Sequence, residues 1–183
     1  MSHRLVDKQV IFTGKKVRLE VHHLEDEDDP TSRTRREVVV HPGAVVVLPV
    51  MQNDNILLIR NRRYAIEQTL IELPAGTLEK GEDPINCAGR ELLEETGFLA
   101  NRLVPIGSFY SSPGVLTEKM YVYAAYDLEK QEQALEAGEE IELMAVDFPE
   151  AVDMIRTGQI QDGKTIAALL MFDRFHRLNQ AEG

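Results

Sequence analysis

Three glutamates in one predicted helix have the chemical type and the spacing to hold a divalent cation. Arg90, Glu91, Glu94 and Glu95 follow a glycine-containing stretch, and about 100° of rotation per residue puts the glutamates on one side. Like charges at this spacing destabilise a helix by about 0.2–0.5 kcal/mol per pair, so the cluster is unfavourable unless something offsets it. Because Mg²⁺ binds through carboxylates and substrate phosphates, the cluster predicts a metal site.

Local signals predict where the helix that carries these residues begins and ends. Asp83 before Pro84 is typical of an N-cap, and Gly97 is typical of a helix end. Three apolar residues at helical spacing predict one buried side, which would hold the acidic side in place: Ile85, Ala88 and Leu92. The alternative is a solvated acidic face, which is common in a chain this acidic.

A longer pattern surrounds this helix and fills nine constrained positions over residues 76–98. It reads Gly-x5-Glu-x7-Arg-Glu-U-x-Glu-Glu-x-Gly-U, where U is a bulky apolar residue. The pattern resembles the Nudix box, the signature of Nudix hydrolases, and is far more specific than a short glycine motif. The resemblance implies an α/β/α sandwich and hydrolysis of a nucleoside diphosphate linked to another group. The nine positions are Gly76, Glu82, Arg90, Glu91, Leu92, Glu94, Glu95, Gly97 and Phe98.

The remaining periodicity predicts an α/β chain with a mixed sheet. The apolar run 44–50 is typical of a strand covered on both faces. Other strands are expected at 17–21, 35–41, 56–60, 70–73, 103–110, 120–128 and 141–148, and further helices at 149–157 and 165–178. Residues 43–183 would form the Nudix domain. Residues 1–42 would form a small antiparallel β element, which in similar proteins takes part in dimerisation, so a homodimer is expected.

Features outside the box indicate a subgroup. Pro113, in a Ser-Pro-Gly sequence, lies 16 residues after Gly97 and resembles the ADP-ribose pyrophosphatase subgroup. The resemblance implies hydrolysis of ADP-ribose or a related nucleoside diphosphate sugar to a nucleoside monophosphate and a sugar phosphate. GDP-mannose, dinucleoside polyphosphates and modified nucleoside triphosphates are alternative substrates. A non-catalytic nucleotide-binding module is a further alternative, but such modules commonly lose the box carboxylates, which are all present here.

The resemblance also assigns roles to single residues. Glu91, Glu95 and the main-chain carbonyl of Ala75 match the metal positions, with Glu94 as the third carboxylate, for Mg²⁺ or else Mn²⁺. Arg90 would orient Glu94 four residues on. Glu82 would support the loop before the helix, and Gly76 and Gly97 are expected to serve backbone geometry.

The resemblance further implies that the general base and the substrate-binding residues lie outside the helix, with the base on an acidic loop after the box. Glu139 is the first choice for the base, with Glu140 and Glu136 as alternatives, so Glu139, Glu94 and Arg90 form the expected catalytic set. Arg63 would bind phosphates as a bidentate donor. Arg36 and Glu37 would reach the base or ribose across a dimer interface, and Glu118, five residues after Pro113, would bind ribose hydroxyls. Each of these could instead be an ordinary surface charge.

Composition limits the partners. The chain has 183 residues and a net charge of −11, which argues against a nucleic-acid-binding surface. A metal and local arginines still allow an anionic small molecule in a cleft. Cys87 is the one cysteine, so no intrachain disulfide can form. There is no apolar run of about 18 residues, so no membrane association is expected. We expect a cytoplasmic location.

Overall fold

The computed structural model describes residues 3–29, 31–51, 54–135 and 140–177. The chain divides into two compact units, one of residues 1–43 and 110–119 and the other of residues 44–109 and 120–183. The first unit therefore includes a ten-residue segment from the middle of the chain. The expected functional division at residue 42 stays a prediction.

The first unit is an antiparallel sheet in the order β1-β2-β3. Its strands are β1 (His3–Thr13), β2 (Arg18–Asp26) and β3 (Arg33–Val40). The segment 110–119 is joined to β3 because the Val39 N–H donates to the Val115 carbonyl at 2.7 Å and the Thr117 N–H donates to the Val39 carbonyl at 3.0 Å. Strand β1 is exposed along its whole length, including five large apolar residues: Leu5, Val6, Val10, Ile11 and Phe12.

The second unit contains two sheets. One has the order β7-β4-β9-β8 and comprises β4 (Ala44–Pro49), β7 (Ala75–Thr77), β8 (Phe98–Tyr110) and β9 (Lys119–Lys130). The other has the order β10-β5-β6 and comprises β5 (Asn55–Arg63), β6 (Gln68–Glu72) and β10 (Ile141–Asp147). Because β4 pairs parallel with β9 and antiparallel with β7, the first of these sheets is mixed, as expected.

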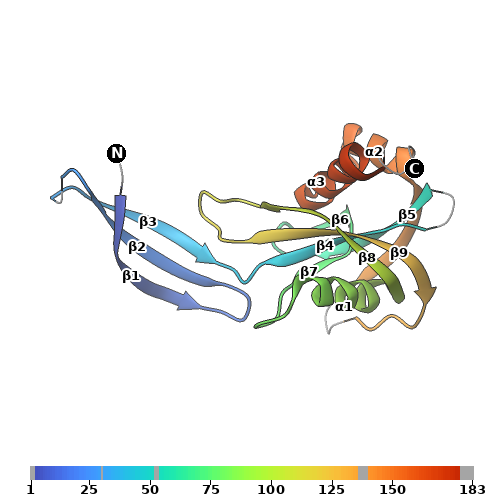
Figure 1. Cartoon of the computed structure of the whole chain (residues 1–183), viewed down its shortest axis with the longest axis horizontal. Helices are drawn as coiled ribbons and strands as arrows, with labels where there is room; N and C mark the ends of the chain where they lie inside the picture. The colour runs from blue at the N-terminus through green and yellow to red at the C-terminus, as the bar shows by residue number, and fades with distance from the viewer. Residues whose placement is uncertain (1–2, 30, 52–53, 136–139, 178–183) are drawn as a thin grey trace. The chain divides into compact units, whose positions relative to one another are not determined.

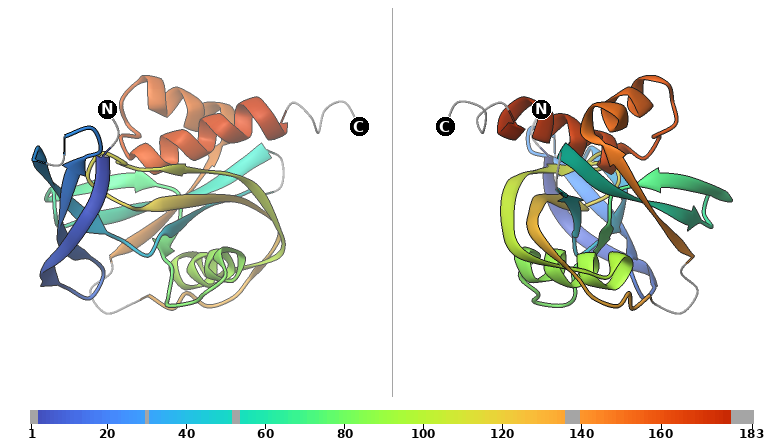
Figure 2. Two further views of the ribbon diagram at one scale, coloured as in Figure 1. Left: turned by 60° about the vertical axis from the view of Figure 1, so that its left-hand side comes forward. Right: turned by 90° about the vertical axis from the view of Figure 1, so that its right-hand side faces the viewer.

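Helices cover both sides of these strands (Figures 1 and 2). Helix α1 (Pro84–Thr96) lies on one side, and α2 (Phe148–Arg156) and α3 (Gly163–Phe172) lie on the other. A short π-helical turn, η2 (Asp173–Arg177), follows α3. Among the described helices, none has both the length and the apolar character needed to span a bilayer.

Strand β4 shows how one short sequence supports both layers. All six of its residues are buried. Val46 and Leu48 belong to the core cluster that includes residues of α2 and α3, and Val45 and Val47 to the cluster that includes residues of α1. This alternation is what a strand covered on both faces requires. The predicted α/β/α sandwich with a mixed sheet is thus confirmed.

The structure differs from the sequence-based expectations in several places. Strand β1 was not expected, and β8 begins at Phe98 rather than at residue 103. The expected helix over 165–178 is α3 followed by the π-helical turn. Ile85 is 40% exposed instead of buried, and Cys87 takes its place on the buried side of α1. The buried side of α1 is therefore rotated slightly around the helix axis relative to the side that the sequence predicted.

Candidate functional site

Both ends of helix α1 are fixed by the residues that the sequence indicated. The Asp83 side chain accepts a hydrogen bond from the Ile85 N–H at 3.1 Å, with Pro84 in the first turn. At the other end Gly97 has a φ of 68° and donates its N–H to the Leu93 carbonyl at 2.8 Å. This left-handed conformation favours glycine. The helix therefore presents its acidic turns in a defined position.

Arg90 gathers three carboxylates at the start of that acidic side. Its Nε and Nη2 atoms donate to the two oxygens of Glu82, each at 3.0 Å. Its Nη1 atom donates to Glu91 at 2.7 Å and to Glu94 at 3.0 Å. The hydrogen bonds from Arg90 lower the pKa of Glu82 to about 2, and the same bonds raise the pKa of Arg90. One positive charge thus orients three negative ones.

Gly76 lies directly against the carboxylate of Glu91. A Cβ atom at Gly76 would be 1.8 Å from the Glu91 Cδ and 2.0 and 2.2 Å from its oxygens. Gly76 is not among the described glycines with positive φ, which are Gly43, Gly81, Gly97 and Gly158. The expectation that Gly76 serves backbone geometry is therefore wrong: its missing side chain makes room for Glu91.

Glu95 connects the helix to strand β7. Glu95 is 3% exposed, and its Oε2 atom accepts the Ala75 N–H at 2.9 Å. The Val47 N–H donates to the Pro74 carbonyl at 2.9 Å, so the next pair in this antiparallel ladder, Val46 and Ala75, is not hydrogen-bonded. The N–H and the carbonyl of Ala75 therefore both point away from β4. The N–H donates to Glu95, and the carbonyl points to that same side of β7.

The oxygen atoms where α1 meets β7 are suitable ligands for a hard divalent cation. Among the described histidines, cysteines, aspartates and glutamates, no three side chains form a metal-binding group by themselves. Glu91 and Glu95, with the directed carbonyl of Ala75, supply oxygen atoms, the ligands that Mg²⁺ prefers when substrate phosphates complete its shell. The absence of a side chain at Gly76 leaves room for the Glu91 carboxylate, which is consistent with a carboxylate held in place as a metal ligand.

Arg63 is held by a buried partner that the sequence did not indicate, and its expected phosphate-binding role stays a prediction. It forms a bidentate ion pair with Glu72, whose side chain is fully buried, with 2.8 Å between the Arg63 Nε and Glu72 Oε1. The hydrogen bond to Glu72 raises the pKa of Arg63, and the charge of Glu95 adds to this effect. Lys164 from α3 also donates to Glu72, at 2.9 Å. Sequence reasoning missed Glu72 and Lys164, although a glutamate inside an apolar strand segment was a readable signal.

The other expected substrate-binding residues belong to the first unit. Arg36 is exposed and donates to the carbonyl of Arg35 at 3.0 Å, and Glu37 and Pro113 are exposed as well. Glu118 lies 3.5 Å from Nδ1 of His41. The structure thus brings the helix residues together with Ala75 and leaves the roles of these four residues as predictions.

The segment before the expected base is attached to the end of α1. The Gln131 N–H donates to the Gly97 carbonyl at 2.7 Å, and the Ala134 N–H donates to the Glu94 carbonyl at 3.0 Å. The side-chain amide of Gln133 donates to the carbonyl of Glu95. These bonds satisfy carbonyls at the helix end that have no partner within the helix. Glu139 and Glu136 lie outside the described residues, and Glu140, which is exposed, directly precedes β10.

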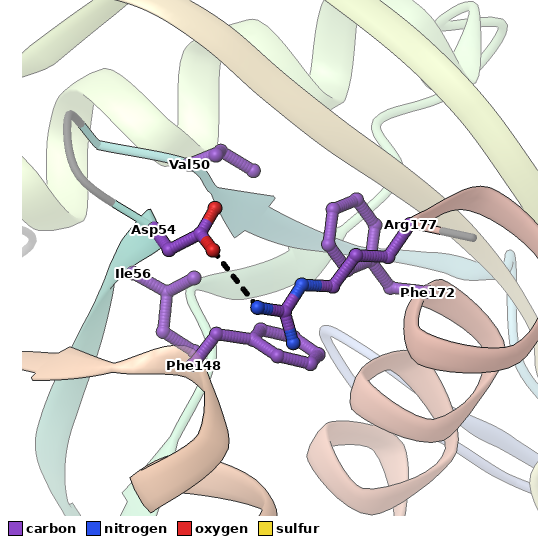
Figure 3. Close-up of a pocket in the computed structure, with 6 residues that line it drawn as sticks. All are labelled: Val50, Asp54, Ile56, Phe148, Phe172 and Arg177. Atoms are coloured by element: carbon purple, nitrogen blue, oxygen red, sulfur yellow. Dashed lines mark hydrogen bonds and ion pairs between the residues drawn. The ribbon is translucent and has the colours of Figure 1, made fainter. Parts of the chain in front are cut away.

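The second unit also has a small cavity of about 50 Å³ that contains none of the expected site residues. Arg177 crosses it, with its guanidinium 4.7 Å from the centre of the Phe148 ring and 2.9 Å from the carboxylate of Asp54 (Figure 3). Val50, Ile56 and Phe172 complete the lining. Ligand pockets for small molecules usually measure about 300–1,000 Å³, so this cavity is too small for a nucleotide.

Several known proteins are similar to this chain over most of its length. It is 38% identical to an ADP-ribose pyrophosphatase of Bacillus subtilis over 172 residues, which are 92% of this chain and 91% of that protein. It is also 38% identical to a methanol dehydrogenase activator of Bacillus methanolicus, over 92% of this chain and 91% of that protein. A GDP-mannose pyrophosphatase of Enterobacter is 34% identical over 75% of this chain and 76% of its own length.

The fold is also known. A solved structure of an ADP compounds hydrolase matches with a TM-score of 0.85 at 21% identity, covering 100% of this chain and 97% of that one. The sequence matches the NUDIX domain over residues 40–169, a range that includes α1, β7 and the whole core cluster that contains residues of α1. From this match and from the nine box positions, the chain belongs to the Nudix family.

Proposed function

We propose that this protein hydrolyses the pyrophosphate bond of ADP-ribose or a related nucleoside diphosphate sugar, with Mg²⁺, to a nucleoside monophosphate and a sugar phosphate. The observation that carries the proposal is the joint placement of Glu91, Glu95 and Ala75, where α1 meets β7. The similarity to the ADP-ribose pyrophosphatase of Bacillus subtilis supports the choice of substrate.

Three groups would hold the metal: the carboxylates of Glu91 and Glu95 and the carbonyl of Ala75, with Glu94 as a fourth candidate. When bound, a divalent cation neutralises charge on the phosphates and lowers the pKa of an attacking water. Arg90 would not contact the substrate, because its donors are engaged with Glu82, Glu91 and Glu94. Its role would be to hold the carboxylates of Glu91 and Glu94 in their rotamers.

Glu139 would act as the general base, with Glu140 and Glu136 as alternatives. A base must come within hydrogen-bonding reach of the water from which it takes a proton. The attachment of Gln131 and Ala134 to the end of α1 supports this assignment, because it starts the base-carrying segment beside Glu94 and Glu95.

Arg63 would bind a phosphate with the part of its guanidinium that remains accessible. Its side chain is 37% exposed although Nε and Nη2 are bonded to Glu72. Such a bidentate pair fixes the guanidinium plane, which favours directed contacts to an anion. Arg36, Glu37, Glu118 and Pro113 would contact the nucleoside.

A homodimer is part of the proposal. Strand β1 lies at the edge of its sheet and exposes five large apolar residues, between 43% and 58% each. An exposed apolar edge strand favours pairing with another chain. We propose a cytoplasmic location, which the single buried cysteine fits.

A second substrate has specific support. The 34% identity to a GDP-mannose pyrophosphatase makes GDP-mannose the main competitor. Both substrates contain the same diphosphate, so the metal site would serve either one, and the contacts to base and sugar would decide between them.

A substrate panel tests the proposal. Purified protein with Mg²⁺ is incubated with ADP-ribose, GDP-mannose, other nucleotide sugars and nucleoside triphosphates, and the nucleoside monophosphate is quantified. The kcat/KM for a nucleotide sugar should exceed that for any triphosphate by at least about tenfold. Excess chelator or Glu95→Gln should remove most turnover. A preference for triphosphates, or full activity of Glu95→Gln, would contradict the proposal.

A further inference from the structure

The N-terminus of α3 is bonded to the main chain just before the proposed metal ligand Ala75. The Thr165 hydroxyl accepts the Leu73 N–H at 2.8 Å, although the two residues are 92 positions apart in sequence. The same hydroxyl donates to Asp162 at 2.6 Å, and the Thr165 N–H also donates to Asp162, at 2.9 Å. Asp162 is the N-cap of α3, so the helix start is locked to the Thr165 side chain.

A charged contact reinforces this attachment one residue earlier. The Lys164 ammonium donates to Glu72 at 2.9 Å and to Asp162 at 2.6 Å. Arg63 donates to both oxygens of the same Glu72 carboxylate and shares Oε2 with Lys164. Glu72 is fully buried, and a buried carboxylate persists only with good partners. Two cations and two anions therefore close a neutral network between β5, β6 and α3.

The short segment from Glu72 to Ala75 is held at every position. Glu72 is bound by Arg63 and Lys164, and the Leu73 N–H by Thr165. Pro74 has no N–H, and its carbonyl accepts from Val47. Ala75 donates to Glu95. Hydrogen bonds and the segment 72–75 thus connect Thr165 and Lys164 of α3 with the Glu95 carboxylate of α1.

We infer that Thr165, Lys164 and Glu72 are positioning residues, which hold the Ala75 main chain in place for a divalent cation. The inference rests on the proposed function, since it concerns the metal site of that reaction. Mg²⁺ demands nearly ideal geometry at about 2.0–2.1 Å, so a carbonyl ligand must be placed closely. A carbonyl on a three-residue strand such as β7 has little secondary structure of its own to hold it. The α3 contacts supply that support.

A pair of substitutions at Thr165 separates this role from simple packing. Thr165→Val keeps the shape but removes the hydroxyl, leaving the Leu73 N–H without its acceptor. Thr165→Ser keeps the hydroxyl but removes a buried methyl group. Binding of Mn²⁺ to the free protein is measured by electron paramagnetic resonance, without substrate, and the thermal midpoint of each variant is recorded.

Thr165→Val should weaken Mn²⁺ binding by about tenfold or more, the usual effect of losing a group that orients a metal ligand. Thr165→Ser should bind Mn²⁺ like the wild type. Ile160→Val, at a buried apolar position, is the control for lost stability and should also keep the wild-type affinity. If affinity follows the thermal midpoint in all three variants, the residues only stabilise the fold and the inference is wrong.

Lys164→Met provides a second test, also available if Thr165→Val fails to fold. It keeps the aliphatic part of the side chain and removes the bonds to Glu72 and Asp162. Mn²⁺ binding should again fall by about tenfold. If Lys164→Met binds Mn²⁺ with the wild-type affinity, Lys164 and Glu72 do not position the Ala75 main chain, and that part of the inference is wrong.

Glu95→Gln in the same titration distinguishes two kinds of failure. Weak binding in Glu95→Gln together with wild-type binding in Thr165→Val would overturn the positioning role alone. Wild-type binding in Glu95→Gln would overturn the proposed metal site, and the positioning role with it.

Discussion

Replacing Gly76 with alanine should disable the proposed metal site while leaving the fold nearly intact. The added Cβ would be 1.8 Å from the Cδ of Glu91, whereas ordinary contacts begin near 3.4 Å. The carboxylate would thus have to retreat by about 1.6 Å, the difference between these distances. Because the obstructing atoms end a flexible side chain, Glu91 would move rather than the backbone.

The size of the effect follows from this displacement. A shift of about 1.6 Å is large against the Mg²⁺–oxygen distance of about 2.0–2.1 Å, so Glu91 would leave the coordination sphere. The bond from Arg90 to Glu91, now 2.7 Å, would have to rearrange as well. We expect kcat/KM to fall at least about 100-fold, equivalent to about 2.7 kcal/mol. The thermal midpoint should change by less than about 3 °C.

The assay combines steady-state hydrolysis of ADP-ribose over a range of Mg²⁺ concentrations with thermal unfolding. Gly89→Ala is the matched control, since a Cβ at Gly89 in α1 meets only Leu103, at an ordinary 3.7 Å. Alanine should stabilise that helix by about 0.5–1 kcal/mol and leave the rate unchanged.

A double-mutant cycle then isolates the contact. If Gly76→Ala acts by displacing Glu91, the double variant Gly76→Ala/Glu91→Gln should be little worse than Glu91→Gln alone. Two losses that add in free energy would refute the reasoning, and so would a wild-type rate in Gly76→Ala.

Three further predictions follow from single residues. Glu139→Gln should lower kcat by about 10²–10⁴-fold with little change in KM, while Glu140→Gln and Glu136→Gln do much less; similar small losses at all three positions would place the base elsewhere. The pKa of Glu82 is lowered from 4.5 to about 2, so its contribution to stability is complete above pH 4.5 and is lost as the pH falls towards 2. Denaturant unfolding at several pH values should therefore give a flatter profile for Glu82→Gln over this range, and parallel profiles would contradict the assignment. Burial raises the pKa of Cys87 to about 12, so a thiol reagent at pH 8 should modify the protein only as it unfolds; rapid modification of the native protein would count against this burial.

Local chemistry explains what the sequence predicted well. The start and end of α1 depend on Asp83, Pro84 and Gly97, which act through neighbouring residues and can be read directly. The contact of Arg90 with Glu94 follows from helical spacing alone. Strand β1 was missed because the register shifts near Leu5 and Val10 break the alternation that identifies a strand.

Tertiary arrangement explains what the sequence did not predict. Glu72 and Lys164 are 92 residues apart, so their contact depends on how α3 packs against β6. For the same reason, a surface or phosphate-binding role was the natural interpretation of Arg63, and its buried partner was not foreseen. Gly76 was assigned to backbone geometry because nothing in the sequence shows which side chain will lie against it.

The attachment of residues 131–134 to the end of α1 has a consequence for how this active site could diverge. The anchor uses main-chain carbonyls of Glu94, Glu95 and Gly97, which persist whatever side chains the helix carries. Insertions or deletions after Ala134 would therefore change how far the segment with the proposed base extends, while its attachment to the end of α1 stays the same. Laboratory evolution aimed at new substrates could therefore vary the length of the chain from residue 135 onward while the proposed metal ligands on α1 and β7 stay unchanged.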